Sequence, residues 1–145
     1  MKKTIFIILT LSLSLISASL FADGYKIKVK INGVSDTVAY LGFHYGEKLR
    51  SMDTVLLDNK GIGTFQGDEK LGGGIYLVFL PSRGMTYFEI LIDKEQNFSF
   101  ETDTTNFVEN MKIKGSEEGK QFYEFQKKCQ ASKKEQKNFK KHIED

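Results

Sequence analysis

Short apolar runs separated by turn-forming residues fill positions 25–114, and this spacing constrains the fold more than any other feature of the chain. No helix-length periodic segment interrupts the stretch, which argues against β-α-β units and predicts a mainly β fold. We expect an antiparallel β-sandwich or partly open barrel of about eight strands, followed by one C-terminal α-helix. The expected strands cover residues 25–31, 37–45, 51–57, 62–66, 75–80, 87–92, 98–102 and 111–114.

Side-chain alternation predicts where several of these strands lie. Residues 25–31 alternate apolar side chains with lysines, the pattern of a half-buried, edge-like strand. Residues 37–45 are apolar on both faces, which predicts a central strand, with Gly42 marking a β-bulge. The turn-forming residues 58–61 predict that residues 51–66 fold as a β-hairpin.

The composition changes at residues 115–145, which are rich in Lys, Glu and Gln. Ser116 is a typical N-cap, and Glu117 and Glu118 follow where the helix dipole favours acidic residues, so we predict a helix over 117–143. Its heptad-spaced seam consists of Phe122, Phe125, Cys129, Ser132, Gln136, Phe139 and Ile143. The two apolar ends of the seam are expected to dock on the β domain or on a partner. Because the seam restarts close to the end of the chain, one hypothesis is that the chain is a truncated or split form of a longer one.

Residues 1–22 have the order of a secretory signal peptide, with two lysines, an apolar stretch and then small residues. Cleavage is expected after Ala22, with Ser19 and Ala18 as alternatives, and an uncleaved N-terminal anchor is the other interpretation of the segment. The apolar stretch is shorter than the roughly 20 residues of a membrane span. We therefore expect an exported protein of the periplasm or cell envelope, without a membrane span after cleavage.

Removal of this leader changes the charge of the chain. It takes away two of 21 basic residues and none of 19 acidic ones, so the formal charge falls from +2 to 0. A neutral chain lacks the basic footprint expected of a nucleic-acid-binding protein. Cys129 is the only cysteine, so neither an intramolecular disulfide nor a lipoprotein cleavage site is expected. The mature chain should consist of a β domain, residues 23–114, and a charged helix, residues 115–145.

Patterns typical of metal or catalytic sites are missing from the sequence. His44 and His142 are 98 positions apart, and there is no Cys pair or His-Glu-x-x-His motif, so we expect neither a metal nor a cofactor. Asp53 and Asp58 flank a strand and are interpreted as solvated. Cys129 has lysine neighbours that can lower a thiol pKa, but a seam residue is favoured over a reactive thiol because no His or second Cys is near.

A few residues remain as candidates for a ligand site. Glu89 interrupts an apolar strand and is either a pocket acid or a solvent-facing residue on the face of Tyr87 and Leu91. Exposed tyrosines could line a sugar- or peptide-binding surface, although core packing also explains them. The candidates are Glu89, Cys129, Tyr40 and Tyr76, with Tyr45 as a further exposed tyrosine.

The order of several short motifs between Gly24 and Gln126 resembles one protein family. The motifs are Gly24–Gly33 (GYKIKVKING), Asp36–Gly42 (DTVAYLG), Asp53-Thr54, Asp58-x-Lys60-Gly61-x-x-x-Phe65, Gly73–Val78 (GGIYLV) and Phe88–Asp93 (FEILID). Together they resemble the DUF4369-type β domain, a domain of unknown function. That domain stands at the N-terminus of exported thioredoxin-like proteins, of thiol–disulfide oxidoreductase or AhpC/TSA type, in Bacteroidetes-type bacteria.

The resemblance implies a β domain that is followed by helices and by a thioredoxin fold with Cys-x-x-Cys. Cys129 has no partner at that spacing, so the redox activity is not carried over to any residue of this chain. We expect a non-catalytic cell-envelope module with a protein-interaction or structural role, in which the C-terminal helix contacts a protein partner. The alternative is a β-sandwich that binds a small ligand such as a glycan or peptide.

Overall fold

The computed structural model describes residues 24–46, 48–81 and 86–144, with side chains described up to residue 139. The signal peptide predicted over residues 1–22 and the side chains of His142 and Ile143 lie outside this part. The elements are β1 (Tyr25–Asn32), β2 (Val38–Tyr45), β3 (Lys48–Leu56), β4 (Ile62–Gly67), β5 (Gly74–Leu80), β6 (Thr86–Ile92), β7 (Asn97–Asp103), β8 (Lys112–Lys114) and α2 (Glu117–Glu144).

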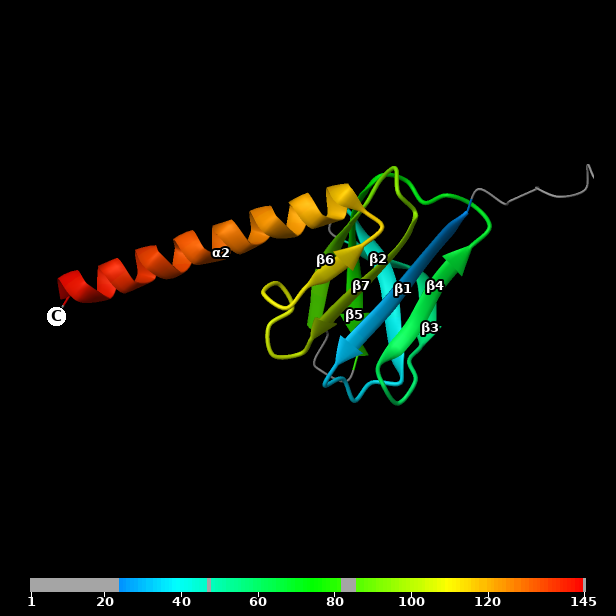
Figure 1. Ribbon diagram of the computed structural model, residues 1–145, viewed down its shortest axis with the longest axis horizontal. Helices are drawn as coiled ribbons and strands as arrows, with labels where there is room; N and C mark the ends of the chain where they lie inside the picture. Colours follow the sequence, from blue (N-terminus) through cyan, green and yellow to red (C-terminus); the bar gives the residue numbers. More distant parts are fainter. Residues whose placement is uncertain (1–23, 47, 82–85, 145) are drawn as a thin grey trace, which may run out of the picture.

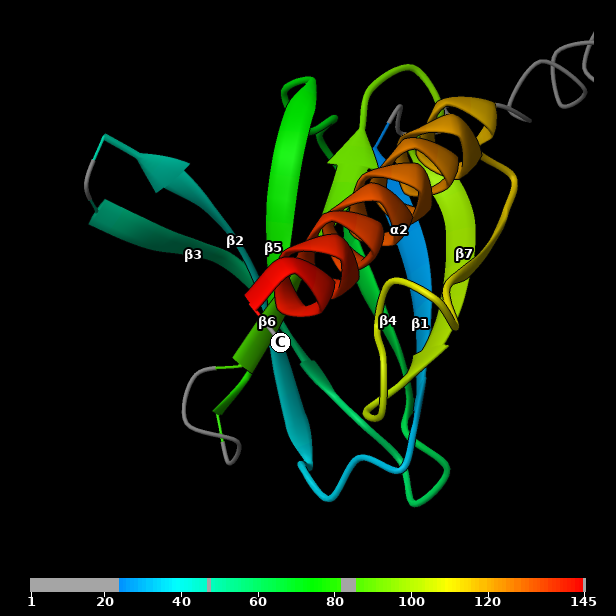
Figure 2. The same cartoon turned by 90° about the vertical axis from the view of Figure 1, so that its left-hand side faces the viewer.

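The strands form two four-stranded sheets packed face to face (Figure 1). Sheet 1 has the order β4-β1-β7-β8, and sheet 2 has the order β3-β2-β5-β6. Figure 2 shows sheet 1 and sheet 2 on either side, with α2 running in front of the space between them. The predicted fold class is confirmed, as a sandwich followed by one helix.

The hydrophobic core lies between the two inner faces. Because successive side chains of a strand point to opposite faces, Ile27, Val29 and Ile31 of β1 are all fully buried while the lysines between them face outward. Phe65 of β4 and Leu80 of β5 are also fully buried. Each such side chain contributes about 1.5–3 kcal/mol when removed from water. The core is therefore the main source of stability in a domain with a single free cysteine.

The position of β1 differs from the prediction of an edge-like strand. β1 lies between β4 and β7, antiparallel to β4 and parallel to β7, from Lys26 opposite Asn97 to Asn32 opposite Asp103. Alternating lysines show that one face of the strand is exposed to solvent. A central strand with one solvated face has the same sequence pattern as an edge strand, so the pattern does not distinguish the two positions. The other strand pairs of the two sheets are antiparallel, as expected.

The hairpin predicted over residues 51–66 is wrong. β3 pairs with β2 in sheet 2, whereas β4 pairs with β1 in sheet 1, so the chain crosses between sheets at the turn after β3. Asp58 holds this turn, since its Oδ1 accepts hydrogen bonds from the backbone N–H groups of Lys60 at 2.8 Å and Ile62 at 2.9 Å. Gly63 permits the close approach that follows, because a Cβ there would lie 2.7 Å from Cγ2 of Val55.

The predictions for β2 are confirmed. β2 is central in sheet 2, between β3 and β5, and the β2–β3 register shifts between Leu41 and Gly42, as expected for a bulge. A Cβ at Gly42 would lie 2.5 Å from the carbonyl oxygen of Arg50, so the bulge brings the two backbones too close for a side chain.

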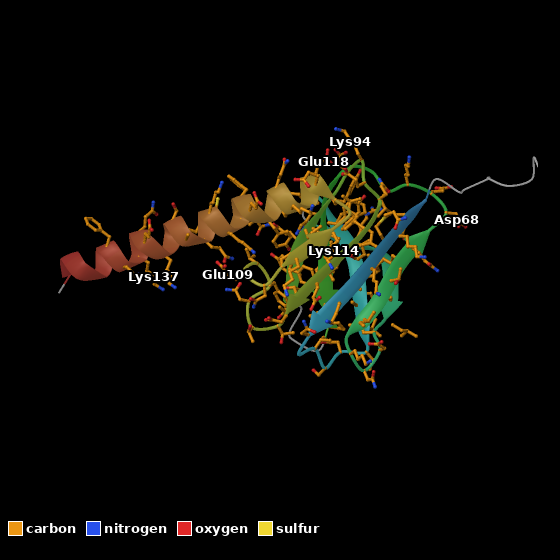
Figure 3. The ribbon with its side chains drawn as sticks, viewed as in Figure 1. Asp68, Lys94, Glu109, Lys114, Glu118 and Lys137 are labelled. Atoms are coloured by element: carbon orange, nitrogen blue, oxygen red, sulfur yellow. The ribbon has the colours of Figure 1, made fainter. Side chains whose placement is uncertain are left out.

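Helix α2 begins as its sequence predicts. The Ser116 Oγ accepts a hydrogen bond from the backbone N–H of Gly119 at 3.0 Å, which is N-cap geometry. Lys94 Nζ, on the β6–β7 turn, lies 3.3 Å from Glu118 Oε1, and Figure 3 shows the two residues together at the start of the helix. The first turns of α2 contact β6 and β8, and therefore cover the open side of the sandwich where both sheets end.

The docked face of α2 only partly follows the predicted seam. Tyr123, outside the seam, is 3 % exposed and belongs to the core, while the seam residue Phe122 packs against the core partly buried. Phe125 and Phe139 are 65 % and 68 % exposed, so these two do not dock on the β domain, and the alternative expectation of docking on a partner stays a prediction. Only the first turns reach the sandwich, and beyond them the helix extends away from it (Figure 1). In the described residues no helix combines the length and apolar character needed to cross a membrane.

Candidate functional site

A cleft opens where α2 leaves the sandwich, and it contains one of the residues singled out from the sequence. Its walls are the outer face of β6, the loop between β7 and β8, and the third and fourth turns of α2. The cleft has a volume of about 350 Å³ and is lined by Tyr87, Phe88, Glu89, Thr105, Asn106, Phe107, Val108, Gln126 and Gln130. In Figure 3, Glu109 marks the same loop close beneath α2.

Glu89 lies half-buried at the junction of β6 and α2. Its Oε2 accepts a hydrogen bond from Nε2 of Gln126 at 3.1 Å, and its backbone carbonyl accepts a hydrogen bond from the hydroxyl of Tyr123. Burial, with a smaller contribution from the Glu89 charge, raises the pKa of Tyr123 well above its ordinary value. Tyr123 is therefore a neutral donor, and both bonds tie the helix to β6.

The loop that forms the opposite wall is fixed by its own hydrogen bonds. Asp103 Oδ1 accepts from the backbone N–H of Thr105 at 2.9 Å and from the Thr105 hydroxyl, and these bonds lower the pKa of Asp103. The hydroxyl of Thr102 donates to the carbonyl of Phe107 at 2.8 Å. The ring of Phe107 then lies with its centroid 4.9 Å from that of Phe88, which closes the floor of the cleft.

The lining of this cleft offers one charged side chain. Glu89 is the only carboxylate among the lining residues, which include no His, Cys or Lys. Glu89 Oε2 is held by the hydrogen bond from the amide of Gln126. The arrangement can accept hydrogen bonds from a small polar group.

The other residues predicted from the sequence do not join Glu89. Tyr76 faces the core, 7 % exposed, and its hydroxyl donates to the carbonyl of Gly72 at 2.8 Å. Tyr40 pairs with Phe79 on the outer face of sheet 2, so the two candidate tyrosines lie on opposite faces and cannot share a site. Cys129 is a half-buried free thiol on α2, and His44 is exposed near the end of β2.

Tyr40 instead lines a small apolar groove on the outer face of sheet 2. The groove has a volume of about 230 Å³ and is lined by Tyr40, Leu49, Ser51, Phe79 and Pro81. Nearby apolar side chains on this face are half exposed, among them Ile75 at 50 % and Tyr87 at 51 %. The groove offers aromatic and aliphatic contact, and two of its lining side chains, Tyr40 and Ser51, carry a hydroxyl.

Asp53, interpreted from the sequence as solvated, links the two sheets. Its Oδ2 accepts a hydrogen bond from the hydroxyl of Tyr25 on β1 at 2.8 Å and from the backbone N–H of Gln66 on β4 at 3.1 Å. Burial, followed by the hydrogen bond to Asp53, raises the pKa of Tyr25 to about 12. Asp53 is engaged in structure, and within the described residues no group of three or more His, Cys, Asp or Glu side chains could hold a metal ion.

Sequence reasoning missed Tyr123 and Gln126, which position Glu89. The available signal was the apolar pair Phe122-Tyr123 at the start of the helix, in which only the first residue fits the heptad pattern. Which of two adjacent aromatics is buried depends on how the helix meets the sandwich, and local spacing does not encode that angle.

Comparison with known proteins gives a family but no described function. A family model described as "Domain of unknown function (DUF4369)" matches residues 25–122, which span all eight strands and α2 as far as Phe122. No curated protein and no solved structure gives a significant match to the chain.

Proposed function

The chain belongs to the DUF4369 family, and on that premise we propose that its mature form is a non-catalytic cell-envelope module that acts by binding another protein. The observation that carries the proposal is the helix α2, of which only the first turns are docked. Residues 131–139 are all exposed, and Phe125 and Phe139 present large apolar surfaces to solvent. Exposed aromatic side chains on a rigid helix are typical anchors of protein interfaces.

The charge of the part of α2 that extends beyond the sandwich indicates what kind of protein surface could bind it. Residues 127–141 contain seven lysines and one acidic residue, Glu135. A second copy of this segment would bring like charges together, which disfavours self-association. An acidic protein surface with apolar pockets for Phe125 and Phe139 fits better than a second copy.

Site-specific photo-crosslinking in the producing cell tests the proposal. A benzoylphenylalanine at position 139 should give a discrete crosslinked species, and Phe125→Ser in the same chain should reduce it because one of two anchors is lost. The matched control places the crosslinker at Leu56, which is 76 % exposed at the end of β3. Absence of a discrete species from position 139, or equal crosslinking from position 56, would count against an interface on α2.

The non-catalytic part of the proposal needs its own assay. The family resemblance includes thiol–disulfide proteins, and Cys129 is the one thiol of this chain. The purified mature chain should reduce a disulfide-bonded substrate no faster than its Cys129→Ser variant. A rate that depends on Cys129 would overturn the non-catalytic assignment.

Export to the periplasm or cell envelope is part of the same proposal. It rests on the basic, apolar and small-residue order of positions 1–22. Intact-mass measurement on protein from the extracytoplasmic fraction should give a chain that begins at Asp23. A cytoplasmic protein that retains Met1 would refute export.

The groove beside Tyr40 favours one alternative function, the binding of a small glycan or peptide on sheet 2. Aromatic faces are typical of such sites, and the lining is mostly apolar. A ligand present at about 100 times its Kd would stabilise the folded chain by about 2.7 kcal/mol. A thermal-shift screen with envelope glycans and peptides should therefore show stabilisation that Tyr40→Ala abolishes, and a screen without any shift would remove this alternative.

A further inference from the structure

The outer face of sheet 1 gathers lysines from opposite ends of the β domain. Lys28 and Lys30 come from β1, while Lys112 and Lys114 come from β8, more than 80 residues later. β7 separates the two pairs in the sheet, and all four lysines line one groove of about 310 Å³. Figure 3 labels Lys114, which lies on β8, the edge strand next to β7.

Strand register arranges these lysines in two rows across β7. In one row, Ser99 lies directly between Lys28 on β1 and Lys114 on β8. In the next row, Glu101 lies between Lys30 and Lys112. Neighbouring strands are about 4.8 Å apart, so the two backbones that carry each lysine pair are about 10 Å apart. Flexible four-carbon stems allow both ammonium groups of a row to reach the strand between them.

The two rows differ in charge compensation. Lys30 Nζ lies 2.9 Å from Glu101 Oε1, and the hydrogen bonds from Asn32 and Lys30 lower the pKa of Glu101. Lys28 and Lys114 form no ion pair with any described residue. Four lysines and one glutamate leave a net charge of +3 on the lining of the groove, although the mature chain as a whole is neutral. Within the groove, the row through Ser99 therefore holds two lysines and no acid, and it is the more cationic of the two rows.

We propose that this groove binds a phosphate group, held between Lys28 and Lys114 with the Ser99 hydroxyl beneath it. A phosphate presents up to two negative charges and three acceptor oxygens, enough to take a hydrogen bond from each of these three side chains at once. Lysine binds phosphate as a point charge, which suits donors on long stems. Glu101 pairs with Lys30 and so lowers the positive charge in the other row of the groove. The site lies on sheet 1 and is independent of the protein interface on α2.

Titration of the isotopically labelled mature chain with inorganic phosphate tests the proposal at constant ionic strength. The amide signals of Lys28, Ser99 and Lys114 should shift saturably, and the Lys28→Ala/Lys114→Ala double variant should bind at least about tenfold more weakly. A matched double variant, Lys48→Ala/Lys60→Ala, removes the same charge away from the groove and should keep its Kd within about twofold. All four side chains are exposed, so both variants should retain the urea transition of the parent chain.

A second arm distinguishes the source of the phosphate group. Vesicles of phosphatidylcholine containing phosphatidylglycerol should retain the protein through Lys28 and Lys114 if a lipid headgroup is the ligand. Binding of inorganic phosphate without retention on vesicles would identify a soluble phosphate compound. Shifts that do not saturate, shifts centred on the lysines of α2, or equal weakening in the two double variants would mean an adventitious ion only and would overturn the proposal.

Discussion

Truncation of Tyr123 is the sharpest test of how the helix and the sandwich depend on each other. Tyr123 is 3 % exposed, belongs to the core and donates a hydrogen bond to the carbonyl of Glu89. Removing a buried aromatic ring costs about 3–5 kcal/mol, and we expect Tyr123→Ala to lower the free energy of unfolding by about that amount. Tyr123→Phe keeps the ring and leaves the carbonyl without this donor, so its expected cost is about 1 kcal/mol.

Urea denaturation of the mature chain measures these costs by far-ultraviolet circular dichroism and by tyrosine fluorescence. With a slope of about 1–3 kcal/mol per molar urea, the midpoint for Tyr123→Ala should fall by roughly 1–5 M in both signals together. Phe125→Ala is the matched control, since Phe125 is 65 % exposed and its loss should cost less than about 0.5 kcal/mol. If the helix signal were lost while the β transition kept its midpoint, α2 would be an appendage and the idea that it completes the core would be refuted.

Three further outcomes follow from single contacts. The pKa of Tyr25 is raised to about 12, so its phenol favours folding while it is protonated. This contribution to stability is intact below about pH 10 and is lost as the pH rises toward 12. In urea titrations across that pH interval, Tyr25→Phe should therefore show a smaller fall of stability than the parent chain. Ser116→Ala should cost about 1 kcal/mol by loss of the N-cap, whereas Ser132→Ala, exposed in the same helix, should cost less than about 0.5 kcal/mol; comparable losses would contradict the cap. Gly63→Ala should destabilise by about 1–3 kcal/mol in calorimetry because its methyl group would lie 2.7 Å from Val55, and an unchanged melting temperature would show that the sheets can separate locally at no cost.

The strands could be predicted from the sequence because their signals are local. Alternation over β1, the apolar run of β5 and the turn at Asp58 each report a property of neighbouring residues. Strand partners are not local properties. The turn at Asp58 predicts a reversal of the chain, but it does not tell a hairpin from a crossing between sheets. The close approach at Gly63, which the crossing requires, is seen only in the folded chain.

The candidate site residues also could be predicted only where their signal is local. Glu89 could be recognised from sequence because one acid interrupts an apolar strand. The lysines of β1 and β8 were visible as two separate charged runs, and only the parallel pairing of β1 with β7 places them on one face. Tyr40 and Tyr76 could be recognised as aromatic residues of the strands. The structure shows that Tyr40 lies on the outer face of sheet 2 and Tyr76 on the inner face, so they do not form one site.

The pairing of β1 with β7 also affects the order in which the strands can fold during synthesis. Lys26 meets Asn97, so the two strands are 71 residues apart in the chain. A polypeptide that emerges with its N-terminus first can assemble β1 with β4, but one edge of β1 stays open until residue 103 has arrived. An open edge can pair with other chains, and contacts this distant in sequence form slowly. The domain should therefore depend on a holding chaperone until its last third has emerged, and chains interrupted before β7 should aggregate rather than fold.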